Sequence, residues 1–221
     1  MKLFVNKNEG RARAWIRIPF YIVLVFVLMA LSNSLPLGGA QFVFTALVVF
    51  GFTWLMFRFG DQRSSHKQLG LNVSLVWWKE FGGGVAIGMV AMAAIFGVEY
   101  YSGGLEIVGF GWQGHTGISW LAPVVLFLAQ MLSVGFYEEI MSRSYLINNF
   151  KEGFTGWKIN PQQATVLAII MSSALFGMFH IANPNASVFA LINIFGAGVM
   201  LSIPYVLTGR LAYSVGLHFS W

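Results

Sequence analysis

The chain of 221 residues contains no cysteine, and only 10% of its residues are charged. The lack of cysteine excludes a disulfide scaffold, a zinc–thiolate site and a cysteine nucleophile. Soluble domains carry about 25% charged residues. A chain with so few charges and with 57% hydrophobic residues is too apolar to fold in water as a single domain of this size. A net charge of +5 fits nucleic acid as well as a membrane surface, so the positions of the charges decide between them.

Long stretches without any charge alternate with short charged segments. The uncharged stretches are 40 residues between Arg17 and Arg58, 18 between Glu80 and Glu99, 31 between Glu106 and Glu138, and 51 between Lys158 and Arg210. One membrane helix needs about 20 mostly apolar residues, so these stretches accommodate two, one, one and two helices. The residues after Arg210 can form only a short further helix. The sequence therefore predicts an all-α, polytopic membrane protein with six full spans and a truncated seventh.

The basic residues define the orientation of these spans. All 13 Lys and Arg residues lie in the N-terminal segment or in every second segment between spans, and the other segments have none. The positive-inside rule places such segments in the cytoplasm, which predicts a cytoplasmic N-terminus. We expect Arg143 to form an ion pair and the other basic residues to define the orientation of the spans in the membrane. Membrane lipids are then the expected partner, and nucleic acid is not.

The spans divide the chain into three parts. Residues 1–14 form a basic cytoplasmic segment. Residues 15–118 form the N-terminal transmembrane helices, with an interfacial helix expected near residues 69–79, where Trp77 and Trp78 would lie at headgroup level. Residues 119–221 form a core whose last helix would cover only about 16 Å, roughly half the hydrocarbon thickness. We therefore expect this core to be C-terminally incomplete.

One compact set of ionisable residues lies within the predicted spans: Glu138, Glu139, Arg143, His180 and His218. Such residues are costly in a membrane and are functional candidates by default. Counting helix rise from the cytoplasmic side brings the acidic pair and both histidines to about the same depth on three different helices. The alternative is that the acidic pair and Arg143 only mark a helix end, and that each histidine is an interhelical hydrogen-bonding residue.

The spacing of the charged residues also predicts different roles for the two carboxylates. Glu139 and Arg143 are four residues apart on one helix face, where an ion pair can form. Glu138 points about 100° away from that face and lacks this partner. Two carboxylates in different environments are the usual arrangement for separate roles in acid–base chemistry, and Glu138 is the candidate general base.

These residues resemble the motifs of the CPBP family of intramembrane proteases, also called the Abi or CAAX prenyl protease type 2 family. The segment from Glu138 to Arg143 matches EExxxR, and the segment from Phe176 to His180 matches FxxxH. His218 resembles the start of the last motif, HxxxN, whose Asn would be the residue after Trp221. The resemblance covers roughly residues 121–221 and makes residues 119–221 a CPBP-like catalytic core.

The resemblance implies hydrolysis of a peptide bond by an activated water. Glu138 would deprotonate the water, His180 would hold it, and His218 with the family's Asn would stabilise the oxyanion. Glu139 and Arg143 would support them. We favour a mechanism without a cofactor. The alternative is zinc, with Glu138, His180 and His218 as its three protein ligands.

The leading prediction is therefore an intramembrane endopeptidase of glutamic or metallo type, with its site open to the cytoplasm. Its substrate would be a peptide or a lipidated protein tail. The family also implies a bacterial plasma membrane and a link to bacteriocin processing or self-immunity. One alternative is a non-catalytic immunity or scaffold protein that binds a partner. A small proton-coupled transporter is disfavoured, because such folds show internal repeats and the motifs lie only in the second half of the chain.

Overall fold

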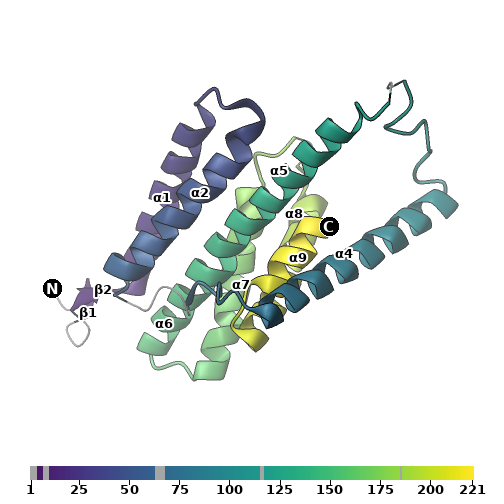
Figure 1. Ribbon diagram of the computed structural model, residues 1–221. Helices are drawn as coiled ribbons and strands as arrows, with labels where there is room; N and C mark the ends of the chain where they lie inside the picture. Colours follow the sequence, from purple (N-terminus) through teal and green to yellow (C-terminus); the bar gives the residue numbers. More distant parts are fainter. Residues whose placement is uncertain (1–3, 7–9, 63–67, 115–116, 185) are drawn as a thin grey trace.

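The fold is that of a helical bundle in which most helices run along one common axis, as the computed structural model shows (Figure 1). It describes residues 4–6, 10–62, 68–114, 117–184 and 186–221. The helices are α1 (Ala14–Asn33), α2 (Gln41–Leu55), α4 (Leu75–Tyr101), α5 (Leu121–Glu139), α6 (Asn148–Gly156), α7 (Pro161–Phe179), α8 (Val188–Thr208) and α9 (Ala212–Ser220). A 3₁₀ turn, η1 (Gly38–Ala40), precedes α2, and two π-helical segments, η2 (Met56–Gly60) and η3 (Ile140–Ile147), extend α2 and α5. Two short antiparallel strands, β1 (Val5–Asn6) and β2 (Arg11–Ala12), precede α1.

Six helical stretches in the described part of the chain are long and apolar enough to cross a membrane. They are Ala14–Asn33, Gly38–Gly60, Leu75–Tyr101, Leu121–Gly156, Pro161–Phe179 and Val188–Thr208. The fourth joins α5, η3 and α6 into one helix of 36 residues. The predicted polytopic all-α fold with six full spans is confirmed, and α9 is the short seventh helix.

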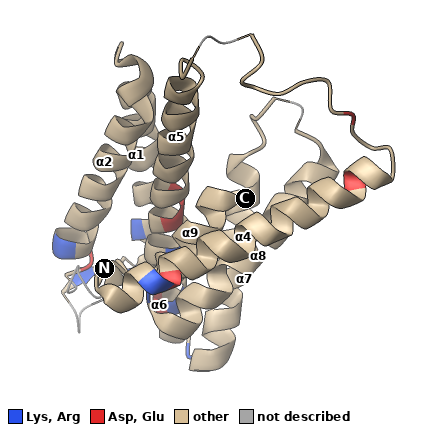
Figure 2. Cartoon of the chain, turned by 45° about the vertical axis from the view of Figure 1, so that its right-hand side comes forward, with Lys and Arg blue, Asp and Glu red and all other residues tan. Residues whose placement is uncertain are grey.

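The described basic residues other than Arg143 gather at one end of the bundle, which we call the charged end. It holds Arg17 near the start of α1, Arg58 in η2, Lys79 near the start of α4, Lys151 in α6 and Arg210 after α8. Figure 2 shows the blue segments in this half of the molecule, whereas the far ends of α1, α5 and α4 have none. This is the end that the sequence predicts to be cytoplasmic.

The interfacial helix expected near residues 69–79 is not a separate element. Residues 71–73 are non-helical, and the helix begins at Leu75 as the first turn of α4. Ser74 is the N-cap, since its hydroxyl accepts a hydrogen bond from the Trp77 backbone N–H at 3.3 Å. The preceding residues instead enter the protein: Leu69 is buried, and the Gly70 carbonyl accepts hydrogen bonds from the Leu211 backbone and from the Trp77 indole.

The short helix α9 packs along the first half of α4 (Figure 1). This contact depends on glycine, because a Cβ added at Gly84 would collide with the Tyr213 carbonyl, and one added at Gly216 would collide with the Phe81 carbonyl. Small residues permit such close backbone approach between membrane helices. Gly209, with a φ of +68°, ends α8 and lets the chain turn back into α9. The turn brings α9 beside α5 and α8 as well.

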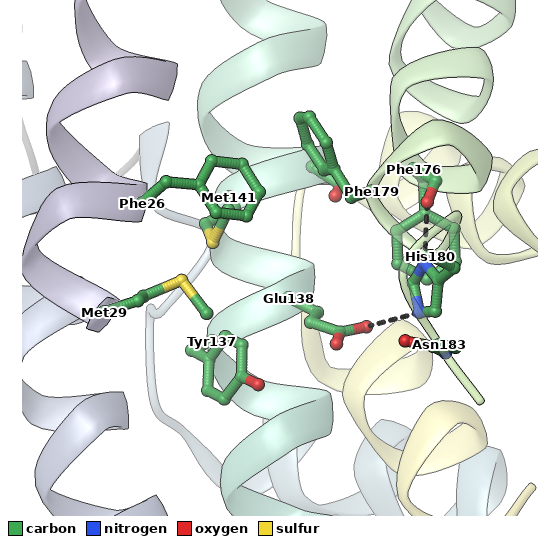
Figure 3. Close-up of a pocket in the computed structure, with 10 residues that line it drawn as sticks. Phe26, Met29, Tyr137, Glu138, Met141, Phe176, Phe179, His180 and Asn183 are labelled. Carbon is green, nitrogen blue, oxygen red and sulfur yellow. Dashed lines mark hydrogen bonds and ion pairs between the residues drawn. The ribbon is translucent and has the colours of Figure 1, made fainter. Parts of the chain in front are cut away.

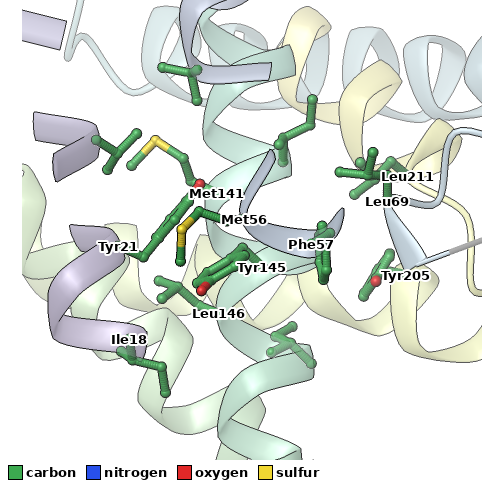
Figure 4. Packing of buried hydrophobic residues seen from close by; sticks show 14 of the residues in the cluster. Ile18, Tyr21, Met56, Phe57, Leu69, Met141, Tyr145, Leu146, Tyr205 and Leu211 are labelled. Carbon is green, nitrogen blue, oxygen red and sulfur yellow. The ribbon is translucent and has the colours of Figure 1, made fainter. Parts of the chain in front are cut away.

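Aromatic and aliphatic side chains fill the bundle between the charged end and its middle (Figure 4). Tyr145 of η3 is fully buried, stacks on Tyr21 of α1 at a centroid distance of 3.7 Å, and meets Phe57 of η2 edge-on at 5.4 Å. Leu69 and Leu211 close the same cluster from the α8–α9 side. This packing fixes η3, and with it the residues just before it, against α1 and α2.

A buried ionic network lies at the charged end, where the sequence predicts only orienting charges. Arg17 is 3% exposed and pairs with Asp61 and with Glu152, the latter at 2.6 Å. Asn149 donates a hydrogen bond to Asp61 at 3.0 Å, and Arg11 pairs with Glu152 at 3.3 Å. The expectation that Arg143 alone among the basic residues forms an ion pair is therefore wrong, because Arg17 joins α1 to η2 and α6.

Candidate active site

The five residues singled out in the sequence come together in the middle of the bundle. Glu138 and Glu139 are the last residues of α5, and Arg143 lies in η3, one turn further along the same helix. His180 follows the last residue of α7, and His218 lies in α9. Three separate helices thus deliver their polar groups to one level, as their helix rise predicts.

Glu139 is the centre of a completely buried group of charges. Its side chain is 0% exposed, and Oε2 lies 3.1 Å from Nε of Arg143, which is 1% exposed. His218 Nδ1 lies 2.8 Å from Glu139 Oε1, where it donates a hydrogen bond to the carboxylate. Both oxygens of Glu139 are therefore engaged by positively charged or hydrogen-bonding partners.

Arg143 is held from three sides. Besides Glu139, its guanidinium donates a hydrogen bond to the Gly198 carbonyl of α8 at 3.1 Å. Its Cζ lies 4.4 Å from the ring centroid of Phe176, a cation–π contact. Arg143 thus joins η3 to both α7 and α8. This role as a tie between helices goes beyond the ion pair that the sequence predicts.

Glu138 points away from the Arg143 side chain and remains partly accessible. Its Oε2 lies 3.8 Å from His180 Nε2 and 3.6 Å from His218 Nε2, and these three side chains are each about one-fifth exposed, at 19–20%. Hydrogen bonds in proteins are usually 2.7–3.2 Å long. The three groups are therefore too far apart for short direct bonds and close enough to bind one water molecule together.

The hydrogen bonds of the two histidines define which nitrogen faces Glu138. His180 Nδ1 lies 2.7 Å from the Phe176 carbonyl oxygen and donates to it. His218 Nδ1 donates to Glu139. In the neutral rings the proton is then on Nδ1, and the lone pair of each Nε2 points toward Glu138. The FxxxH spacing has a local cause here, because the carbonyl one turn before His180 orients its ring.

The π-helical segment η3 begins directly after the two glutamates. All eight of its residues are buried. A π-helix changes the hydrogen-bonding pattern of the backbone, and such segments occur frequently at functional sites. Side chains of neighbouring residues bond its carbonyls: Ser172 of α7 donates to Ser142 at 2.6 Å, and Asn149 donates to Tyr145 at 3.0 Å. The sequence reasoning assumed a regular α-helix here and missed this feature.

A cavity of about 210 Å³ lies directly in front of the Glu138 carboxylate. It is lined by Phe26 and Met29 of α1, by Tyr137 and Glu138 of α5, and by His180 and Asn183 at the end of α7 and after it. Figure 3 shows the Glu138 and His180 side chains pointing toward each other, with Asn183 beside them and the α1 side chains across the cavity. Asn183 is not among the site residues that the sequence predicts. The spacing of three residues after His180 was the signal that could have indicated it.

Zinc, the alternative to a mechanism without a cofactor, would be held by Glu138, His180 and His218. In the part of the chain that the structure describes, no group of three or more His, Asp or Glu side chains is arranged to hold a metal ion. Glu138, His180 and His218 converge at the separations given above. Catalysis without a cofactor stays a prediction, with zinc held by these three residues as its alternative.

The comparisons with known proteins agree with this arrangement. Residues 119–221 match the family model described as "Type II CAAX prenyl endopeptidase Rce1-like", a match that contains all five residues. The comparison with curated proteins gives no match. The comparison with solved structures gives none either. Residues 119–221 are therefore similar to the type II CAAX prenyl endopeptidases, the family whose motifs the sequence resembles.

Proposed function

We propose that the chain is an intramembrane endopeptidase in which Glu138 activates a water molecule. One observation carries this proposal. Glu138 is the carboxylate that faces the cavity, with the Nε2 atoms of two histidines at 3.8 and 3.6 Å, whereas the neighbouring Glu139 is fully engaged by Arg143 and His218. The family match indicates a protease in a membrane but assigns no residue a role.

The reaction follows from what this cluster can bind and exchange. A water bound by Glu138 and the Nε2 atom of His180 attacks the carbonyl carbon of the scissile peptide bond. The proton leaves the water for the Glu138 carboxylate, and the π electrons of the carbonyl move onto its oxygen. When the tetrahedral intermediate collapses, the C–N bond breaks and Glu138 returns the proton to the leaving amine. The products are a carboxylic acid and an amine, and Glu138 is again ionised.

Glu139 and Arg143 serve as positioning residues in this scheme. Glu139 accepts the Nδ1–H of His218, which holds that ring with its Nε2 toward Glu138. Arg143 balances the buried charge of Glu139 and packs on Phe176, whose carbonyl orients His180. The two histidines are thus oriented by one connected group of residues.

The position of the cavity favours a substrate that enters from the lipid bilayer. Below Glu138, toward the charged end, every residue of η3 is buried. The cavity extends instead toward α1 and the end of α7, where Phe26 and Phe179 meet edge-on at 4.8 Å. We therefore propose that the substrate approaches between α1 and α7. The cytoplasmic opening, the bacterial plasma membrane and a role in bacteriocin processing or self-immunity remain predictions.

The substrate class that the family description names is a prenylated CAAX tail, a C-terminal sequence in which two aliphatic residues follow a lipidated cysteine. Such a tail fits the lining, because an apolar chain and an adjacent peptide bond can both lie between α1 and Glu138. The experiment uses the full chain in liposomes with a fluorescence-quenched peptide that ends in farnesyl-Cys, two aliphatic residues and a variable residue.

The decisive variant is Glu138→Gln, which keeps the shape of the side chain and removes the base. We expect turnover to fall by about 10²–10⁴-fold, the usual contribution of a general base. Glu106→Gln is the matched control, since Glu106 is exposed and lies in the segment between α4 and α5. Addition of the chelator 1,10-phenanthroline to the same assay should leave turnover unchanged. Cleavage by Glu138→Gln at the wild-type rate would refute the role of Glu138, and the absence of cleavage by the wild type would favour the non-catalytic scaffold.

A further inference from the structure

Another cavity, of about 300 Å³, lies at the charged end between α1, α6 and α7. Its described lining consists of apolar and aromatic side chains and one glycine: Ala14, Trp15, Ile18, Pro19, Phe150, Gly153, Phe154, Trp157 and Met171. The volume is at the small end of the range of ligand pockets, which is roughly 300–1,000 Å³. A cavity lined in this way is suited to a hydrocarbon chain, because it has no charged side chain to hold the polar part of a ligand inside it.

The helix α1 indicates the depth of this cavity in the membrane. α1 has 20 residues and is therefore about 30 Å long, which is the thickness of the hydrocarbon core. Its lining residues belong to its first two turns, so the cavity begins at the boundary between hydrocarbon and headgroups. Trp15 and Trp157 meet there at a centroid distance of 5.6 Å, and tryptophan is enriched at that boundary. Pro19 and Trp157 are exposed, so the cavity is accessible from outside the bundle.

Basic residues flank the headgroup side of this cavity. Arg13 is the N-cap of α1, and its Cζ lies 5.4 Å from the ring centroid of Trp15. Lys158 directly follows Trp157 and is exposed. The acidic residue of the neighbouring surface, Glu152, is already paired with two arginines. The rim therefore presents positive charge beside a space suited to hydrocarbon.

We propose that this cavity binds an anionic phospholipid, with one acyl chain between α1 and α6 and the phosphate beside Arg13 and Lys158. Basic pockets between membrane helices on the cytoplasmic side bind anionic headgroups, and the charged end is the one that the sequence predicts to be cytoplasmic. Charge complementarity selects this occupant, because an uncharged lipid would use the apolar lining and leave the two cations unused.

This lipid site is separate from the Glu138 cavity. Among the described residues, none lines both cavities. Met171 lines one and His180 the other, and they lie nine positions or about 13 Å apart along α7 and its end. The inference therefore goes beyond the proposed function and does not depend on it.

The test measures lipid selectivity by quenching of tryptophan fluorescence and needs no turnover. The full chain is placed in vesicles of equal parts phosphatidylcholine and phosphatidylglycerol, with bromine on the acyl chains of one lipid or of the other. Trp15 and Trp157 line the cavity and report its occupant. Each basic residue beside an anionic headgroup strengthens binding about fivefold. We therefore expect a preference of about 25-fold for phosphatidylglycerol, seen as stronger quenching when that lipid carries the bromine.

The first pair of variants removes charge. Arg13→Gln combined with Lys158→Gln should bring the preference close to one, because only the apolar lining remains. Arg58→Gln combined with Lys79→Gln is the matched control, since both residues are exposed basic residues of the charged end on η2 and α4, which are not among the elements around the cavity. This control should keep the wild-type preference.

The second pair of variants fills space on α6. A Cβ added at Gly153 meets the Ala14 Cβ at 3.5 Å, an ordinary contact, so Gly153→Leu should be accommodated and should occupy part of the cavity. Gly156→Leu is its control, because a Cβ there meets nothing within 4 Å and Gly156 is not part of the lining. Excess quenching by brominated phosphatidylglycerol should disappear in Gly153→Leu and persist in Gly156→Leu. If Gly153→Leu does not fold, the two charge variants decide.

Equal quenching by the two brominated lipids in the wild type would overturn the inference. So would an equal loss of preference in both charge variants, which indicates only a general attraction of the charged end to anionic lipids, or excess quenching that survives in folded Gly153→Leu. Displacement of brominated phosphatidylglycerol by the farnesylated peptide would assign the cavity to the substrate instead. Glu138→Gln should bind the lipid as the wild type does, so a failure of the lipid site and a failure of the proposed catalysis are separate results.

Discussion

The ion pair between Glu139 and Arg143 should show a large energetic coupling. The charges are 3.1 Å apart, and both side chains are at most 1% exposed. At an effective dielectric constant of about 20, two unit charges at this separation attract by about 5 kcal/mol. Each ion also loses several kcal/mol of hydration on burial. The pair is therefore expected to contribute little net stability, whereas one partner left alone in the interior is strongly destabilising.

The perturbation is a double-mutant cycle with Arg143→Met and Glu139→Gln. Each single change should lower the free energy of unfolding by about 3–5 kcal/mol. Arg143→Met should be the more harmful, because it also removes the cation–π contact with Phe176 and the hydrogen bond to Gly198. The Gln side chain keeps an oxygen that can accept from His218. The double variant removes both charges and should cost clearly less than the sum of the single changes.

Unfolding is measured by titration with SDS in mixed micelles, with tryptophan fluorescence as the signal from the 8 Trp residues. The matched control is the same cycle at Glu80 and Arg210, whose arginine side chain is 33% exposed. Solvent screens that pair, so its coupling should be much smaller. Additivity of the Glu139 and Arg143 changes within about 0.5 kcal/mol, the usual range for independent sites, would refute the reasoning.

Two further predictions concern regions outside the cavity. Arg17→Met leaves the buried Asp61 without its main cation and should lower the free energy of unfolding by about 3–5 kcal/mol in the same SDS titration. The turnover of the folded fraction should stay near wild type. Arg58 is exposed, so Arg58→Met should leave the stability unchanged, and equal effects of the two substitutions would contradict the network. Gly216→Ala should disrupt the α4–α9 contact, because its Cβ collides with the Phe81 carbonyl, whereas Gly97→Ala meets nothing within 4 Å and should be neutral or slightly stabilising. Thermal melting in detergent distinguishes the two alanine variants.

The spans and the composition of the site could be predicted from the sequence because both depend on where charge is tolerated. Uncharged stretches define helix lengths in a membrane, and helix rise then gives the depth of each polar group. That argument predicts the convergence of Glu138, His180 and His218 without knowledge of how the helices pack. The ion pair of Glu139 with Arg143 follows in the same way from their spacing on one helix.

The features that the sequence did not predict depend on contacts between distant segments. Arg17 was predicted only to orient the chain, and it becomes the buried partner of Asp61 only through the packing of α1 against α6 and the ion pair itself. The π-helix η3 has no evident local signal, because its residues are ordinary helix formers; its carbonyls are satisfied by side chains such as Ser172 on another helix. The position of Asn183 beside Glu138 likewise requires the path of the turn after α7.

The partners of the acidic residues separate the proposed base from the rest. Asp61 pairs with Arg17, Glu80 with Arg210, and Glu139 with Arg143. Arginine keeps its charge at any ordinary pH, so these carboxylates have permanent counter-charges, which is what structural stability requires of ions in an apolar interior. Glu138 faces two histidines, the side chains that most readily gain and lose a proton near neutral pH, and an adjoining cavity. A carboxylate placed in that way contributes less to the stability of the fold than a paired one and is suited to exchanging a proton with a bound water.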